Sequence, residues 1–261
     1  MRRIESADNP LCRTLRALAH DPGAVRRLDQ AWLEGIHLAR AALDSGLPAQ
    51  ALVCTEPALR DPEIAQLAER VGDQCVVCVG EALFRQFSTL QHGPAVGLLL
   101  RRPEAGSPRP GVAVVLDRIQ DAGNVGTLLR TAAAAGAGVV YCLRGCAGAW
   151  TPKVLRAGMG AHFALPLVED LLWSDIEARL PRPCYATAAQ ARHGLYELDL
   201  RGDVTWVFGN EGRGVAPDIL ARCDAGVGIP QTGSIESLNV AAAAAVCLYE
   251  GVRQRLAAAA R

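Results

Sequence analysis

Three loops in the second half of the chain carry side chains that could do chemistry. Each loop follows a predicted buried strand, and ligands of open α/β sheets bind at the carboxyl ends of the strands. The side chains are two amides, a carboxylate, a hydroxyl and a guanidinium, which together can bind and orient a polar substrate. In chain order they belong to Asn124, Arg130, Glu211, Ser237 and Asn239.

Plainer structural roles exist for some of these side chains. Asn124 can cap the helix that follows it, and Arg130 can pair with a surface acid. Ser237 can cap the Ala-rich helix expected from about 238 to 257. Such roles do not explain the second loop, Gly209-Asn-Glu-Gly-Arg-Gly214, because only a tightly turning or ligand-hugging backbone needs that much glycine. They also do not explain why a rigid Ile229-Pro230 strand end, a flexible turn and the polar pair Ser237 and Asn239 occur together in the third loop.

The familiar nucleotide-binding loops do not fit the second loop. Gly209 and Gly214 have the spacing of the Walker glycines, but Val215-Ala216 stands where a phosphate loop has Lys and Ser or Thr. The Gly-x-Gly-x-x-Gly pattern of dinucleotide-binding folds is absent from the sequence. The loop therefore gives no support to an ATP or NAD site.

Alternating strands and helices are expected to position these loops. Each predicted strand is a short apolar run, which is typical of strands buried on both faces of a parallel sheet. The first loop leads into a helix predicted over Val125 to Ala135. The second part of the chain therefore predicts a mostly parallel sheet covered by helices on both faces. Its strands are expected at 112–116, 138–143, about 183–187, 204–208 and 226–229.

The first part of the chain predicts a separate, smaller α/β unit. Short buried strands are expected at 51–54, 75–79 and 95–100, and apolar residues recur at helical spacing over residues 24–45. The stretch from Arg101 to Gly111 then concentrates proline, glycine and charge, which is typical of a linker. We accordingly expect one domain over residues 1–104, a linker over 105–111 and a second domain over 112–261.

Composition excludes several classes of protein. With 50% hydrophobic residues and a formal net charge of zero, the chain can bury a core but shows no general basic excess for nucleic acid. Any RNA phosphates would have to meet a local arginine cluster. The nine cysteines are expected to be reduced thiols of a cytoplasmic protein, and Cys75-Val-Val-Cys78 lacks the second ligand pair of a metal site. No metal and no membrane span are predicted.

The three loops, in this order, resemble the motifs of the SpoU (TrmH) family of RNA 2′-O-ribose methyltransferases, which belongs to the SPOUT superfamily. The resemblance covers roughly residues 111 to 256, and Trp32-Leu-Glu-Gly-Ile-His-Leu38 resembles the start of the family's N-terminal substrate-binding domain. It implies an α/β fold with a deep C-terminal trefoil knot, preceded by a small α/β domain like ribosomal protein L30e. It also implies S-adenosylmethionine as cofactor, a homodimer, and RNA as substrate, with rRNA favoured over tRNA.

The resemblance implies a role for each candidate residue. Backbone and apolar contacts to the cofactor are expected from Gly209, Ile229 and Leu238. Four polar side chains would align the ribose hydroxyl. Arg130 would hold an adjacent RNA phosphate and stabilise the developing oxyanion, because a guanidinium is a poor base. The expected catalytic set is Asn124, Arg130, Glu211, Ser237 and Asn239.

Three other classes of protein remain as alternatives. They are an inactive RNA-binding relative, a base methyltransferase on the same fold, and a nucleotide-binding enzyme of doubly wound type. An inactive relative should have lost one of the polar motif residues, and a base methyltransferase should lack the Ser237-Leu-Asn239 segment. The doubly wound enzyme would need the phosphate loops that the sequence lacks.

Overall fold

The chain folds as two compact units. The structure, a computed structural model, describes residues 1–90, 93, 95–189, 191–234 and 237–260. Unit 1 comprises Met1–Glu104 and Trp150–Phe163, and unit 2 comprises Ala105–Ala149 and Ala164–Arg261. The sequence-based division placed residues 150–163 in the second domain, and that assignment differs from the structure. The segment belongs to unit 1 because its helix packs against the strand Gln30–Glu34 of that unit.

Unit 1 is a mixed sheet with helices packed on it. Its sheet has the order β1-β4-β3-β5-β2, in which β5 runs antiparallel to β2 and β3, and the other pairings are parallel. The strands are β1 Arg2–Ile4, β2 Gln30–Glu34, β3 Ala49–Thr55, β4 Val76–Val79 and β5 Val96–Arg101. The helices are α1 Pro10–His20, α2 Ala24–Leu28, α3 Ile36–Asp44, α4 Pro62–Val71, α5 Glu81–Phe84 and α7 Pro152–Gly158, with 3-10 turns at Pro57–Arg60 and Asp73–Cys75.

The helical spacing over residues 24–45 gave a wrong prediction, because β2 interrupts the segment between α2 and α3. The strand is bounded by Asp29 at φ 51° and Gly35 at φ 93°, both in the left-handed region that breaks a helix. At its centre Trp32 is fully buried, lies 5.9 Å from the Phe87 ring and donates from Nε1 to the Phe87 carbonyl at 3.0 Å. Tertiary packing around this indole therefore overrides the local helical pattern.

A buried carboxylate ties the end of β2 to a distant turn. Glu34 is 4% exposed and accepts hydrogen bonds from the Ser88 hydroxyl at 3.0 Å, and from the backbone amide and hydroxyl of Thr89, both at 2.8 Å. The Arg156 Nη1 lies 3.8 Å from the same carboxylate and also donates to the Thr89 hydroxyl. Glu34 thus organises the place where residues 150–163 join unit 1.

Glu34→Ala is expected to lower the free energy of unfolding by about 2 to 4 kcal/mol, since it leaves the part-buried donors of Ser88 and Thr89 without their acceptor and Arg156 without its counter-charge. Urea unfolding followed by the fluorescence of the four tryptophans, of which Trp32 and Trp150 lie in unit 1, measures the change. Glu56→Ala is the control: its side chain is 71% exposed, so the change should stay below about 0.5 kcal/mol. Equal, small effects of the two substitutions would contradict the structural role of Glu34.

Unit 2 is a wholly parallel sheet. The seven strands have the order β10-β12-β9-β11-β6-β7-β8, and every pairing between them is parallel, which confirms the predicted class of sheet. The strands are β6 Ala113–Asp117, β7 Val139–Leu143, β8 Leu167–Leu171, β9 Cys184–Thr187, β10 His193–Gly194, β11 Thr205–Gly209 and β12 Ala225–Gly228. The helices are α6 Ala122–Ala134, α9 Trp173–Ile176, α10 Pro217–Leu220 and α11 Val240–Ala259, with 3-10 turns at Glu177–Arg179 and Leu195–Glu197. A further short helix, α8 Ala161–Ala164, begins in unit 1 and ends with Ala164 in unit 2.

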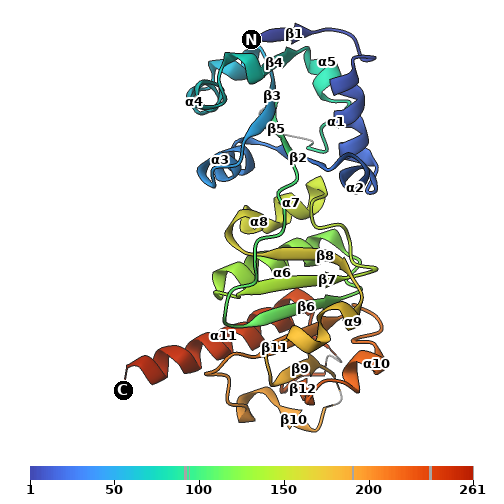
Figure 1. Cartoon of the computed structure of the whole chain (residues 1–261), viewed down its shortest axis with the longest axis vertical. Helices are drawn as coiled ribbons and strands as arrows, with labels where there is room; N and C mark the ends of the chain where they lie inside the picture. The colour runs from blue at the N-terminus through green and yellow to red at the C-terminus, as the bar shows by residue number, and fades with distance from the viewer. Residues whose placement is uncertain (91–92, 94, 190, 235–236, 261) are drawn as a thin grey trace. The chain divides into compact units, whose positions relative to one another are not determined.

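The C-terminal segment returns from one side of the sheet to its middle. β12 pairs with β9 on the side away from β11, yet α11, which follows it, packs against α6 and contacts β11 (Figure 1). This return brings the chain after β12 beside the loop after β11, as the implied knot requires. Among the described residues, no helix has the length and hydropathy to cross a membrane.

Candidate active site

The glycine-rich loop after β11 closes on itself. Gly214 lies at φ 68° and donates from its backbone amide to the Asn210 carbonyl at 2.8 Å. Beneath this turn, a Cβ atom on Gly209 would lie 2.1 Å from the Val215 nitrogen and 2.2 Å from the Gly214 carbonyl carbon. Only glycine therefore permits the crossing of the two backbone segments at residue 209.

The caps of α6 and α11 are not the residues that the sequence indicated. Asp121, not Asn124, caps α6, and its carboxylate accepts from the Asn124 backbone amide at 2.8 Å. Asn239, not Ser237, caps α11, and its Oδ1 accepts from the amides of Ala241 at 2.9 Å and Ala242 at 3.3 Å. The Asn124 side chain is consequently free of capping, while Asn239 has a defined orientation.

One chain of hydrogen bonds joins the three sequence motifs. The Asn239 Nδ2 donates to the Asn124 Oδ1 at 3.0 Å, and the Asn124 Nδ2 donates to the Glu211 Oε1 at 3.1 Å. Because the side-chain Oδ1 of Asn239 accepts from the helix backbone, its Nδ2 must face Asn124. This fixes the orientation of the side-chain amides of both asparagines. Asn124 thus forms one polar unit with Asn239, which is 115 positions away in the sequence, and with Glu211, which is 87 positions away.

The Glu211 carboxylate ends this chain. It also accepts from the backbone amides of Asp121 at 3.1 Å and Gln120 at 3.3 Å. Burial raises the pKa of Glu211, but the hydrogen bonds from Asn124 and from backbone amides outweigh that effect and leave the pKa below its ordinary value. Glu211 is thus an ionised acceptor at neutral pH.

A cavity of about 620 Å³ lies beside this polar chain, within the size range of cofactor sites. It is lined by the loops after β9, β11 and β12 and by the start of α11. The lining combines apolar side chains with the backbone of the glycine-rich loop. Among the described residues no group of three metal-ligating side chains gathers. The cavity is lined by six of the eight predicted site residues: Gly209, Glu211, Ile229, Ser237, Leu238 and Asn239.

Arg130 lies elsewhere on α6. It is exposed and is not among the described residues that line the cavity. Six residues place it about 9 Å along the helix axis and about 120° around it from Asn124. Its predicted contact with an RNA phosphate therefore stays a prediction that concerns the surface outside the cavity.

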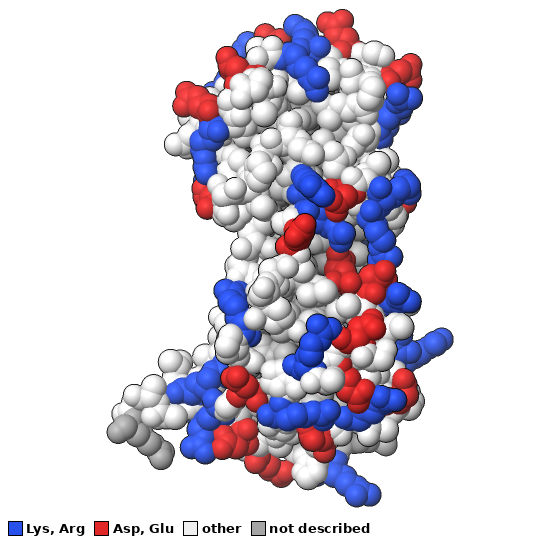
Figure 2. Space-filling model, viewed as in Figure 1, with Lys and Arg blue, Asp and Glu red and all other residues white. Residues whose placement is uncertain are grey.

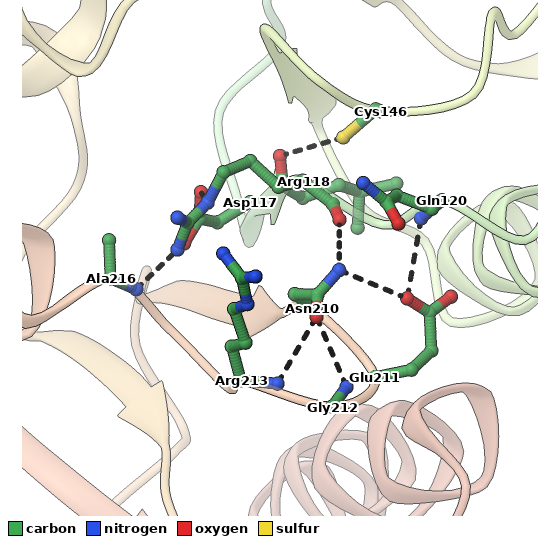
Figure 3. Close-up of polar contacts among 10 residues, drawn as sticks. Asp117, Arg118, Gln120, Cys146, Asn210, Glu211, Gly212, Arg213 and Ala216 are labelled. Atoms are coloured by element: carbon green, nitrogen blue, oxygen red, sulfur yellow. Dashed lines mark hydrogen bonds and ion pairs between the residues drawn. The ribbon is translucent and has the colours of Figure 1, made fainter.

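Sequence reasoning missed a second polar cluster at the end of β6 (Figure 3). Asp117, 2% exposed, accepts from Arg118 Nε at 2.8 Å and Nη2 at 3.0 Å, and from the backbone amide of Ala216 at 2.8 Å. Asn210 donates to the Arg118 carbonyl at 2.8 Å. The sequence signal for this cluster was Asp117, an acid at the end of an apolar strand. Its partner, the Ala216 amide, is 99 residues away and could not be predicted from local sequence.

Comparison with known families identifies the architecture. The family model described as the SpoU rRNA Methylase family matches residues 111–249. The chain belongs to this family. As a SpoU protein it is 35% identical, over 98% of its own length and 95% of the relative's, to an uncharacterized tRNA/rRNA methyltransferase of Synechocystis sp.. It is 32% identical, over 95% and 98%, to the 23S rRNA (guanosine(2553)-2′-O)-methyltransferase RlmP of Bacillus subtilis.

A solved rRNA methyltransferase structure agrees with the fold. The AdoMet-bound rRNA methyltransferase from Sinorhizobium meliloti matches with a TM-score of 0.81 at 26% identity, over 96% of this chain and 97% of that one. The predicted family and fold class are thereby confirmed. Membership in the SpoU family also removes the doubly wound nucleotide-binding alternative.

Proposed function

We propose that this SpoU protein transfers a methyl group from S-adenosylmethionine to a ribose 2′-hydroxyl of ribosomal RNA. The observation that carries the proposal is the hydrogen-bonded chain Asn239–Asn124–Glu211, which joins the start of α11, the start of α6 and the loop after β11 beside the cavity. The names of relatives such as the B. subtilis enzyme favour rRNA over tRNA as the substrate. A homodimer is part of the same proposal.

The cavity fits S-adenosylmethionine in size and in chemistry. Gly209 lets a ligand approach the backbone, while Ile229 and Leu238 offer apolar contact to an adenine ring. Leu238 is 43% exposed, so apolar surface is available for a ligand to cover. When bound, the cofactor supplies an electrophilic methyl group on a sulfonium centre.

The polar chain is suited to orientation rather than to proton abstraction. A carboxylate whose pKa is lowered is a weak base, and the acceptor sites of Glu211 are already occupied by Asn124 and backbone amides. We assign to Glu211, Asn124 and Asn239 the alignment of the ribose hydroxyl, with Ser237 beside them at the cavity. Arg130 keeps its proposed role of holding a phosphate and stabilising the oxyanion.

Asn239→Ala tests the proposal, and it is expected to lower methyl transfer about tenfold, the loss of one orienting hydrogen-bonded group. The assay transfers labelled methyl groups from S-adenosylmethionine to total RNA of a strain lacking this gene, followed by alkaline hydrolysis. Label in an alkali-resistant linkage reports 2′-O-methylation. Asn9→Ala is the control, because Asn9 caps α1 of unit 1 in the same way and lies outside the proposed site.

The assay separates the remaining alternatives. Label found in alkali-sensitive RNA would indicate a base methyltransferase. Cofactor binding without any transfer to RNA would indicate the inactive relative. Absence of cofactor binding would overturn the proposed function altogether.

A further inference from the structure

Arginines gather at one edge of a chain that has no net charge. Arg118 follows β6, Arg144 follows β7, and Arg213 lies in the loop after β11. These three strands are neighbours in the parallel sheet (Figure 1), and each arginine follows the carboxyl end of its strand. On the face drawn in Figure 2, acidic and basic side chains are interspersed.

The Arg118 side chain is held in place before any ligand arrives. Its backbone is left-handed at φ 55°, a conformation that costs a residue other than glycine about 1 kcal/mol or more. Its carbonyl is bound by Asn210, and its guanidinium forms two hydrogen bonds to the buried Asp117. A guanidinium has five N–H groups, so three remain for a ligand. The Arg118 side chain is 38% exposed, which leaves that side of it accessible.

Arg213 supplies charge that no described carboxylate pairs with. Its backbone amide donates to the Asn210 Oδ1 at 3.1 Å, and Figure 3 shows its side chain directed toward the Asp117–Arg118 pair. Arg213 is exposed, and within the described part of the chain no carboxylate lies at ion-pair distance from it. By contrast Arg144 lies 3.6 Å from Asp170 and is compensated.

The positions of the Arg118 and Arg213 guanidinium groups indicate which anion they bind. Arg213 lines the cavity assigned to the cofactor, whereas Arg118 is not among its described lining residues. An anion that contacts both guanidinium groups would therefore extend beyond the described lining of the cofactor cavity. A phosphate diester matches the planar fork of arginine, which binds two of its oxygens at once.

We propose that Arg213 and Arg118 bind a backbone phosphate of the RNA next to the target nucleotide. The inference rests on the proposed function and adds the local arginine cluster that a neutral chain needs to hold RNA. Arg213 contributes net charge, because it has no carboxylate partner among the described residues. Arg118 contributes oriented hydrogen bonds, because Asp117 already neutralises it.

Arg213→Gln is expected to weaken RNA binding about tenfold and to reduce the slope of log K against log salt by about 0.7, the loss of one phosphate contact. The probe is ribosomal RNA from a strain lacking this gene, titrated by filter binding between about 50 and about 300 mM salt. Methyl transfer should show a raised KM with little change in kcat. Arg201→Gln is the control, since Arg201 is exposed and pairs with Asp199.

Arg118→Lys tests the second half of the proposal without leaving Asp117 unpaired. It keeps the charge but loses the fork, so RNA binding should weaken while the salt slope stays unchanged. An unchanged slope in Arg213→Gln would overturn the proposal. Tenfold weaker binding of S-adenosylmethionine by that variant would also overturn it, because Arg213 would then hold the carboxylate of the cofactor. A reduced slope in a protein that transfers no methyl group would uphold the inference and overturn the proposed function.

Discussion

Gly209→Ala is expected to weaken the binding of S-adenosylmethionine about a hundredfold or more, equivalent to about 3 kcal/mol. The added Cβ would lie 2.1 Å from the Val215 nitrogen, 2.2 Å from the Gly214 carbonyl carbon and 2.5 Å from the Gly214 oxygen. All three are backbone atoms, so no side-chain rotation relieves the overlap. The turn that lines the cavity must open, and the backbone surface that faces the cofactor is lost. Isothermal titration calorimetry measures the affinity.

Gly212→Ala is the matched control in the same loop. The nearest heavy atom to a Cβ at this position is the Asn210 Oδ1 at 3.8 Å, an ordinary contact distance. Cofactor affinity should therefore change by no more than about twofold. If Gly209→Ala bound the cofactor as tightly as Gly212→Ala, the backbone crossing at residue 209 would not be what shapes the cavity.

Apolar runs predicted most of the parallel sheet correctly, because strands buried on both faces need continuous hydrophobic sequence. The strands that escaped prediction lack this property. β8, with the sequence Leu-Val-Glu-Asp-Leu, is a half-buried edge strand, and β10 has only two residues, His193 and Gly194. β2 was mistaken for helix since its neighbours α2 and α3 supplied the helical spacing.

For the candidate site, too, local sequence predicted the residue types but not the contacts that individual side chains make. The types of Asn124, Glu211 and Asn239 at predicted strand ends, together with the resemblance to the ordered SpoU motifs, selected them, and the structure joins them in one chain. Local sequence could not decide which polar residue caps a helix, because tertiary contacts set where α6 and α11 begin. Asp117 and Arg118 are adjacent in the sequence, but adjacency alone did not predict their ion pair. The orientation of the Asp117 carboxylate depends on its hydrogen bond from the distant Ala216 amide.

Asn124→Asp is expected to lower methyl transfer about a hundredfold or more at about pH 8, with partial recovery toward about pH 6. The substitution keeps an oxygen for the Asn239 amide but replaces the donor that lies 3.1 Å from Glu211 Oε1 by a second carboxylate. Two carboxylates at this distance cannot both ionise without a large cost, so the pair titrates with one raised pKa. Below that pKa a shared proton restores a hydrogen bond. Rates measured across this pH range test the expectation.

Stability should show the opposite pH dependence in the two proteins. In the wild type the lowered pKa of Glu211 adds stability that is present above the ordinary carboxyl pKa and is lost as the pH falls through the folded-state pKa. In Asn124→Asp the raised pKa makes the folded state bind more protons, so stability is lost as the pH rises between the ordinary and the raised value. Asn9→Asp is the control, because Asp caps a helix as well as Asn. A pH-independent loss of activity in Asn124→Asp would mean that Asn124 contacts the RNA directly and that its link to Glu211 is incidental.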